Sequence, residues 1–218
     1  MPGFVQQIVI GFGTGRCGTN SLAAFLNQQP GYHVTHEQAG LAWYPAITDT
    51  ETCMGRFFAS RTGTVIGDVG FYWINYLPLI LRTYQGAKAI NIRRPLDEVV
   101  ESFWTYKDHG GWDAFSNWYG YPFDAPTQTK DDIASTIRRY RFLEIEVQKL
   151  YPGSIYVMPT KDLNDTPMLE ELLDWLGTKE HKMLRQFFLN TRGEILNKKP
   201  KAPSIPFEGV LRRKDALL

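Results

Sequence analysis

The chain has 218 residues, of which 43% are hydrophobic and 22% charged, and its formal net charge is +1. This length is enough for one substantial hydrophobic core, so we expect a single domain over residues 1–218. A charge so close to zero argues against a general affinity for nucleic acid or anionic membrane surfaces, and we expect no nucleic-acid partner.

Short apolar runs alternate with helical segments along most of the chain. In chain order, the pattern predicts a strand at 8–12, a helix at 21–28, a strand at 32–37, a helix at about 50–60, a strand within 63–70, a helix at 74–84, a strand at 87–92 and a helix at 95–106. It then predicts a long loop at 108–128, a helix at 129–150, a strand at 154–159, helices at 166–177 and 179–190, and an irregular tail from about Thr191. Short strands separated by helices predict an α/β fold of three layers, in which helices flank a mostly parallel sheet.

The longest predicted helix, which begins near Thr129, has the clearest pattern. Its apolar residues recur at steps of three and four and form one stripe, made of Ile133, Ile137, Tyr140, Leu143, Val147 and Leu150. Asp131 and Asp132 lie at its start, where negative charge suits the positive end of the helix dipole. We therefore expect a helix that buries this stripe.

Cysteine content and hydropathy bear on the compartment. Cys17 and Cys53 are too few for a disulfide framework, which favours a reducing environment. The N-terminal residues do not show the basic segment and apolar run of a signal peptide. The longest apolar stretch, WINYLPLIL, is too short to span a bilayer. We expect a cytoplasmic protein without a membrane span.

A glycine-rich loop, GTGRCGT, joins the first predicted strand to the first helix. A loop between a strand and a helix presents unpaired backbone N–H groups to an anion. Gly13 and Gly18 have the spacing of an ATP-binding loop, G-x-x-x-x-G-K-[ST], but Thr19 and Asn20 replace the lysine and the hydroxyl residue. Arg16 supplies a positive charge instead and can make two parallel hydrogen bonds to an oxyanion. The loop predicts an anion cradle made of Gly13, Gly15, Arg16, Cys17, Gly18, Thr19, Asn20 and Ser21.

The segment GTGRCGTNSL resembles the 5′-phosphosulfate-binding loop of the sulfotransferases, which commonly reads G-x-x-[RK]-[SG]-G-T-[TS]-x-L. The residues that match are Gly13, Arg16, Gly18, Thr19 and Leu22. Cys17 and Asn20 depart from the commonest residues of the pattern. The missing lysine and hydroxyl already argue against ATP or GTP chemistry, and the resemblance points to a sulfuryl donor in their place.

A second segment, AINIRRPLDEVVESFW, resembles the family's 3′-phosphate-binding signature. That signature is a strand ending in Arg, a Pro two residues later, and a Ser about eight residues after the Arg. Arg93 has the right place relative to Pro95, whereas Ser102 lies eight residues after Arg94. An arginine and a helix hydroxyl can clamp one phosphate from two sides. Ser102 and both arginines are therefore predicted ligands, and either arginine could be the principal one.

The resemblance implies a P-loop NTPase-like topology and a specific chemistry. It implies transfer of a sulfuryl group from 3′-phosphoadenosine 5′-phosphosulfate to a hydroxyl or amine, with adenosine 3′,5′-bisphosphate as product and no metal required. The acceptor could be a small molecule, a carbohydrate or a lipid. Arg16 would neutralise the bridging and leaving oxygens. A P-loop nucleotide or small-molecule kinase, or a non-catalytic nucleotide-binding module, is the alternative.

Three side chains are candidates for the base that takes the acceptor's proton. The segment VTHE ends the second predicted strand and places His36 and Glu37 near the sheet edge that carries the loop. Glycan-type sulfotransferases use a glutamate about this far beyond the loop, and Glu37 lies 21 residues after Arg16. Aryl and steroid members use a histidine on the strand before the 3′-phosphate strand, where this chain offers Asp68. The resemblance implies Glu37 first, His36 second and Asp68 third; Asp68 also resembles the Walker B carboxylate of a kinase.

Overall fold

The computed structural model describes residues 6–39, 41, 50–107 and 129–179. All of them belong to one compact unit, Met1–Phe187, whereas a second unit, Phe188–Leu218, lies wholly outside the described residues. The loop predicted at 108–128, nearly all of the helix predicted at 179–190 and the predicted irregular tail also lie outside them. A single domain for the whole chain therefore stays a prediction.

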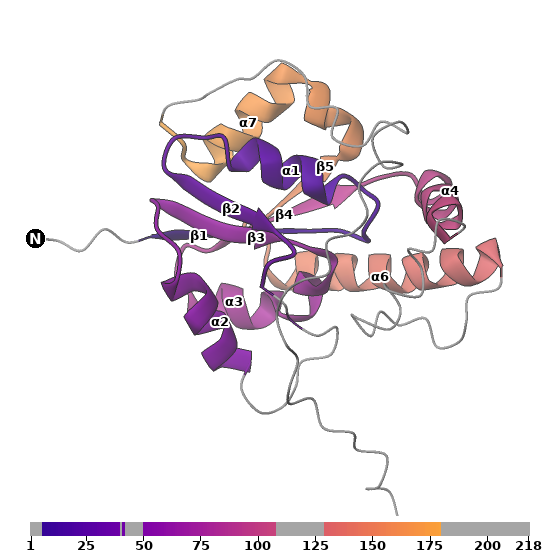
Figure 1. Ribbon diagram of the computed structural model, residues 1–218, viewed down its shortest axis with the longest axis horizontal. Helices are drawn as coiled ribbons and strands as arrows, with labels where there is room; N and C mark the ends of the chain where they lie inside the picture. Colours follow the sequence, from indigo (N-terminus) through magenta and orange to yellow (C-terminus); the bar gives the residue numbers. More distant parts are fainter. Residues whose placement is uncertain (1–5, 40, 42–49, 108–128, 180–218) are drawn as a thin grey trace, which may run out of the picture. The chain divides into compact units, whose positions relative to one another are not determined.

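Five strands form one sheet in which all the described pairings are parallel (Figure 1). In chain order they are β1 Gln7–Phe12, β2 Tyr32–His36, β3 Val65–Val69, β4 Lys88–Arg93 and β5 Ile155–Pro159. Their order in space is β2-β3-β1-β4-β5, so the first strand of the chain is the central one. Helices cover both faces of the sheet, which is why β1 and β3 at its centre are mostly apolar, whereas the edge strand β2 contains two histidines. The predicted parallel α/β sheet is confirmed.

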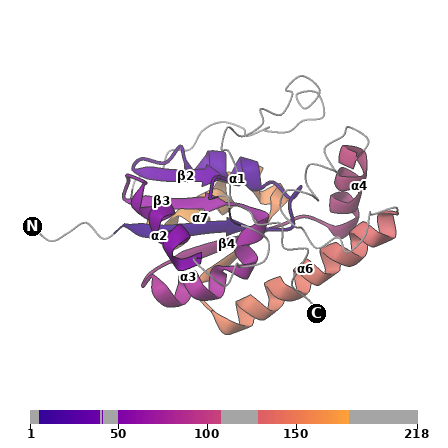
Figure 2. The ribbon, with the colours of Figure 1, turned by 60° about the horizontal axis from the view of Figure 1, so that its bottom comes forward.

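Helices pack on both faces of the sheet and produce the three predicted layers (Figures 1 and 2). On one face lie α1 (Thr19–Leu26) and α7 (Thr166–Leu176), which share a core with the strands. On the other lie α2 (Thr50–Ala59), α3 (Leu77–Thr83) and α6 (Lys130–Leu150). A further helix, α4 (Leu96–Lys107), follows β4 and packs against α6. Each of the three layers therefore consists of elements that the sequence pattern predicts.

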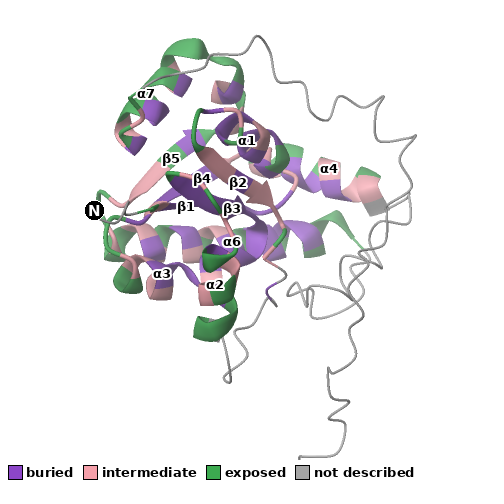
Figure 3. Ribbon diagram, turned by 60° about the vertical axis from the view of Figure 1, so that its left-hand side comes forward, coloured by how far each residue is buried: buried purple, intermediate pink, exposed green. Residues whose placement is uncertain are grey.

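Buried residues lie on the strands and on the helices of both layers (Figure 3), and many of them are large and apolar. Beneath α2, α3 and α6 the core contains Phe12, Phe71 and Trp73, each 0% exposed. Beneath α1 and α7 it contains Leu22 and Leu172, also 0% exposed. Burial of one such side chain contributes about 1.5–3 kcal/mol, so these cores fix the sheet that carries the loops.

Three details differ from the sequence prediction. The helix predicted at 74–84 is two elements, a 3-10 helix η1 (Phe71–Asn75) and α3, which starts after the chain turns and has Pro78 in its first turn. At the end of the α6 stripe, Leu150 is 67% exposed. The helix after the glycine loop begins at Thr19, two residues earlier than predicted.

Within the described ranges, the structure contains no helix with both the length and the apolar character needed to cross a membrane.

Candidate active site

The carboxyl ends of the parallel strands meet at one edge of the sheet, which is where open α/β sheets bind their ligands. Loop 13–18 follows β1 at this edge, Glu37 follows β2, and Arg94 follows β4. A second 3-10 helix, η2 (Thr160–Asn164), follows β5 there. The structure therefore gathers the predicted cradle, the second signature and the candidate bases at the same edge.

The backbone of the glycine loop has conformations and close contacts that favour glycine. Gly15, Arg16 and Gly18 have φ angles of 74°, 55° and 100°, which lie in the left-handed region. At Gly13 an added Cβ would lie 2.5 Å from both the Cys17 Sγ and a backbone oxygen of β4, so the close approach needs glycine. Left-handed residues turn successive N–H groups toward one concave side, which favours an anion there.

The start of α1 adds further donors to this concave side. Its N-cap residue is Gly18, and among the described residues no side chain caps that helix end. The first N–H groups of a helix have no partner within the helix, and the helix dipole gives them a partial positive charge. Thr19 and Ser21 are buried here, whereas Asn20 is exposed. The helix start therefore suits a phosphate or sulfate group.

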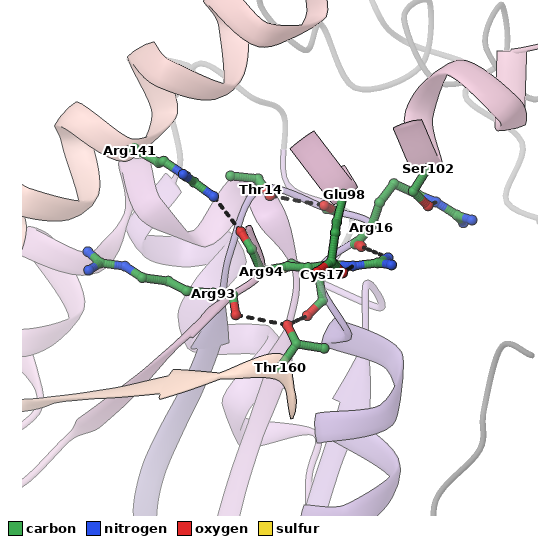
Figure 4. A network of polar contacts seen from close by, with 10 residues as sticks. Thr14, Arg16, Cys17, Arg93, Arg94, Glu98, Ser102, Arg141 and Thr160 are labelled. Atoms are coloured by element: carbon green, nitrogen blue, oxygen red, sulfur yellow. Dashed lines mark hydrogen bonds and ion pairs between the residues drawn. The ribbon is translucent and has the colours of Figure 1, made fainter. Parts of the chain in front are cut away.

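Cys17 contributes its backbone rather than its thiol. Its side chain is 0% exposed, and burial raises the pKa of the thiol to about 12. Its carbonyl accepts a hydrogen bond from the Thr160 hydroxyl, which also donates to the Arg93 carbonyl at 2.9 Å (Figure 4). Thr160 therefore ties the loop after β1 to the end of β4, and the thiol serves as packing.

The Arg16 side chain extends from the loop to Ser102 of α4 (Figure 4). Its Nε donates to the Ser102 Oγ at 3.2 Å, and its guanidinium carbon lies 4.7 Å from the centre of the Tyr106 ring. The Arg94 Nη1 donates to the Arg16 carbonyl at 3.2 Å. Burial lowers the pKa of Arg16 below its ordinary value; Tyr106 opposes this effect, and the Arg94 charge adds to it. Two predicted motifs more than 70 residues apart thus meet at Arg16, whose side chain contacts Ser102 and whose carbonyl contacts Arg94.

The two arginines of the second signature point to different partners (Figure 4). Arg94 pairs with the Glu98 carboxylate one turn along α4, at 2.9 Å. Arg93 pairs with Glu144 of α6 at 3.0 Å, where the glutamate side chain is 1% exposed. Burial raises the pKa of Glu144, and the Arg93 charge opposes this rise. Of the two, Arg94 is the arginine that lies with Ser102 beside Arg16.

A pocket of about 330 Å³ opens beside this arginine pair. Its lining consists of Arg93, Arg94, Pro95, Arg141, Glu144, Ile145 and Pro159. The Nη2 of Arg93 is buried and makes no hydrogen bond within the described part of the chain. A buried donor without a partner costs about 1–3 kcal/mol, and more when it is charged, so an anionic oxygen here would relieve that cost.

His36 and Glu37 lie together at the end of β2. The His36 Nε2 lies 3.1 Å from the hydroxyl of Thr19, the first residue of α1, and 3.9 Å from the Glu37 Oε1. Burial lowers the pKa of His36, opposed by Asp68. Burial raises the pKa of Glu37 to about 7, and the Asp68 charge adds to this rise. The first two candidate bases are thus connected to the cradle through Thr19.

Asp68, the third candidate, is surrounded by protein donors. It is 0% exposed. Its Oδ1 accepts from the Thr35 hydroxyl at 2.6 Å and the Gln38 backbone N–H at 3.1 Å. Its Oδ2 accepts from the Tyr72 hydroxyl at 2.7 Å and the Trp73 indole N–H at 2.9 Å.

Within the described ranges, no three His, Cys, Asp or Glu side chains cluster as metal ligands.

The raised pKa of Glu37 predicts how stability depends on pH. Between pH 4.5 and about 7 the folded protein keeps a proton on Glu37 that the unfolded chain has released, so stability falls as pH rises through this range. At about 1.4 kcal/mol per pKa unit, the cost at high pH is at most about 3 kcal/mol, and the 21% exposure of the side chain reduces it.

A Glu37→Gln variant should therefore be more stable than the parent at about pH 8 and nearly equal to it at about pH 4. Urea unfolding at several pH values measures this difference. Glu170→Gln, at an exposed position of α7, is the matched control and should leave the pH dependence unchanged. An equal gain from Glu37→Gln at every pH would contradict the raised pKa.

Several residues of the site were missed by the sequence analysis. Glu144 occupies a buried place in the α6 stripe, four residues after Tyr140, and its charge within an apolar pattern was the available signal. Thr160 directly follows a predicted strand, at the edge where ligands bind. Tyr106, one turn after Ser102 on α4, carried no signal beyond its spacing.

Comparison with known proteins bears on the fold. A sulfotransferase from Alicyclobacillus acidocaldarius matches with a TM-score of 0.57 at 12% identity, over 87% of this chain and 88% of that one. Sulfotransferase STF9 from Mycobacterium avium matches with a TM-score of 0.51 at 10% identity, over 79% of this chain and 64% of that one, so this chain spans less than two thirds of STF9. No family model and no curated protein sequence matches the chain. The fold is sulfotransferase-like, and the predicted P-loop-like topology is confirmed.

Proposed function

We propose that the protein is a sulfotransferase that moves a sulfuryl group from 3′-phosphoadenosine 5′-phosphosulfate to a hydroxyl or amine. The observation that carries this proposal is the contact of Arg16, in a loop without the ATP-binding lysine, with both Ser102 and Arg94. Those contacts unite the two segments that resemble the family's donor-binding motifs. The sulfotransferase-like fold supports the proposal.

The residues at the sheet edge fit the two anionic ends of this donor. The backbone N–H groups of loop 13–18 and of the start of α1, together with Arg16, would hold the 5′-phosphosulfate. Arg94 and Ser102 would hold the 3′-phosphate, and the unpaired Arg93 Nη2 offers that phosphate a further donor. When bound, the donor supplies an activated sulfuryl group. Positioning and charge stabilisation would then be the main tasks of the protein.

Glu37 is our proposed base. A general base works best when its pKa lies near the working pH, and the pKa of Glu37 is raised to about 7. The acceptor's proton would move from its hydroxyl or amine to the Glu37 carboxylate. His36, uncharged near neutral pH, would orient Glu37 through their 3.9 Å contact. Asp68 is unsuited to this role because both its oxygens already accept hydrogen bonds from protein donors.

Ligand-dependent unfolding tests the proposed function against a kinase. Adenosine 3′,5′-bisphosphate without Mg²⁺ should raise the melting temperature, since a ligand at 100 times its Kd stabilises a protein by about 2.7 kcal/mol. ATP with Mg²⁺ should stabilise it less. Transfer is then measured by mass spectrometry with the sulfuryl donor and a panel of alcohols, amines, carbohydrates and lipids. Stabilisation by ATP and Mg²⁺ alone would replace the proposal with a kinase, and binding without transfer would indicate a non-catalytic module.

The two arginines are expected to differ in their effect on bisphosphate binding. Arg94→Ala should weaken it by about 1.5–3 kcal/mol, the range for hydrogen bonds to charged groups, with little change in stability. Arg93→Ala should instead destabilise the fold by roughly 1–3 kcal/mol, because it leaves the Glu144 carboxylate buried and unpaired while its own 34% exposure limits the loss.

Calorimetry and urea unfolding separate these effects. Combining Arg93→Ala with Glu144→Gln removes both charges and should recover part of the stability. If Arg93→Ala weakened bisphosphate binding more than Arg94→Ala did, the principal ligand would be Arg93.

A further inference from the structure

The turn that follows β2 is fastened to the neighbouring strand by one carboxylate. Asp68 of β3 accepts from the Thr35 hydroxyl at 2.6 Å and from the Gln38 N–H at 3.1 Å. These two donors lie on either side of Glu37, two residues before it and one residue after it. The Glu37 N–H itself donates to the Val69 carbonyl at 3.0 Å. Both ends of the short segment that carries Glu37 are therefore held by β3.

The other side of the same carboxylate is anchored in the core. Its Oδ2 accepts from Tyr72 at 2.7 Å and from Trp73 at 2.9 Å, and both of these side chains are 0% exposed. The aromatic pair belongs to η1, which directly follows β3. Asp68 therefore connects the turn that carries Glu37 to buried side chains of the core.

Glu37 has a backbone that needs such support. Its φ of 53° lies in the left-handed region, which is unfavourable for residues other than glycine. A conformation of this kind persists where the surrounding contacts determine it. The Glu37 side chain also packs close to Gly70, where an added Cβ would lie 3.2 Å from the Glu37 Cγ. The left-handed backbone and the close packing against Gly70 together fix the direction of the Glu37 side chain.

We propose that Asp68 is a positioning residue, which holds Glu37 in its left-handed conformation beside His36 and Thr19. The proposal rests on the proposed function, because it assumes that Glu37 acts as the base. Asp68 thereby has a role other than that of the candidate base named from the sequence. It orients the base through the Thr35 and Gln38 hydrogen bonds and takes no proton itself.

Asp68 also influences the basicity of Glu37 through its charge. Burial raises the pKa of Glu37 to about 7, and the negative charge of Asp68 raises it as well. The other titratable groups around this carboxyl pair are His36 of β2, Tyr72 of η1, and Arg61 after α2, which donates to Thr35 at 3.2 Å. Removing the Asp68 charge should therefore lower the pKa of Glu37, whereas a purely structural role would leave that pKa unchanged.

The test compares three single variants of the full chain. Asp68→Asn removes the charge. Thr35→Val removes a hydroxyl that donates to Oδ1, on the Glu37 side, and leaves Asp68 charged. Tyr72→Phe is the matched control, because it removes a hydroxyl that donates to Oδ2 of the same carboxylate over nearly the same distance, 2.7 against 2.6 Å. The readout is the titration of the Glu37 side chain by ¹³C NMR, with Glu37→Gln to assign its signal.

We expect Asp68→Asn to lower the Glu37 midpoint by about one pH unit, through loss of a like charge. Thr35→Val should lower it by about half a unit, because a released turn exposes the carboxyl to water. Tyr72→Phe should leave it in place. An unchanged midpoint in both Asp68→Asn and Thr35→Val would overturn the proposal, as would an equal shift in Tyr72→Phe. Should Asp68→Asn fail to fold, the comparison of Thr35→Val with Tyr72→Phe still decides.

A second measurement distinguishes failure of this proposal from failure of the proposed function. The parent protein is titrated with adenosine 3′,5′-bisphosphate by calorimetry, which does not depend on Asp68. Absence of binding would remove the proposed function, while the NMR titration would still report whether Asp68 controls Glu37. Binding together with an unmoved Glu37 midpoint would remove only the positioning role.

Discussion

A Glu37→Gln variant is expected to lose turnover by about 10²–10⁴-fold, the usual contribution of a positioned general base. Glutamine keeps the shape of the side chain and removes its ability to take a proton. Affinity for adenosine 3′,5′-bisphosphate should survive, because the proposed donor ligands lie in loop 13–18, α1 and the end of β4. The measurement is product formation from the sulfuryl donor, with calorimetry for the bisphosphate.

The pH dependence of turnover by the parent protein adds a second test of the proposed base. If Glu37 is the base, its carboxylate is the active form, so turnover should rise with pH through the Glu37 pKa of about 7 and then level off. His36→Asn is the matched variant, since it removes the neighbouring group that lies 3.1 Å from Thr19 and should cost less. If His36→Asn abolished transfer while Glu37→Gln retained it, His36 would be the base and Glu37 its orienting partner.

Replacement of Arg16 by alanine is expected to lower turnover by about 10²–10³-fold, by analogy with the loss of an oxyanion-stabilising donor. The proposed contact of Arg16 with the leaving phosphate would strengthen as charge develops there, so the loss should fall mainly on kcat. Stability should change little, because alanine has similar backbone preferences at a φ of 55° and the Arg94 hydrogen bond to the Arg16 carbonyl does not need the side chain.

Two further variants define what Arg16 contributes. Arg16→Lys keeps a charge but loses the planar pair of donors, so it should recover only part of the activity. Arg56→Ala, an exposed arginine of α2, is the control for a general loss of positive charge. Near-normal turnover in Arg16→Ala would contradict the role proposed for the loop.

The sequence was sufficient to predict the sheet, its helical layers and the loop at its edge. Strand runs such as that of β1 are mostly apolar, and helix boundaries carry local signals. Thr129 accepts from the Asp132 N–H and completes a capping box at the start of α6, and Gly177 ends α7 with a φ of 84°. These signals are local, so a single sequence contains them.

Side-chain partners could not be predicted because they depend on rotation about a strand end. Arg93 and Arg94 are adjacent, so their side chains leave β4 in different directions, and only the packed structure shows which of them contacts Arg16. The pairing of Arg93 with Glu144 joins residues 51 positions apart. The proposed role of Asp68 likewise depends on four donors, from β2, the turn after it and η1, which no spacing in the sequence brings together.

The backbones of Arg16 and Glu37 have a consequence for protein engineering. Among the described residues, these are the non-glycine positions with a positive φ, and each conformation costs roughly 1–2 kcal/mol that glycine would not incur. A selection for thermostability alone would therefore favour glycine at both positions. It would thereby remove the proposed leaving-group contact and the proposed base in the most stable clones. Engineering of a more thermostable variant should keep both positions fixed and measure turnover alongside melting temperature.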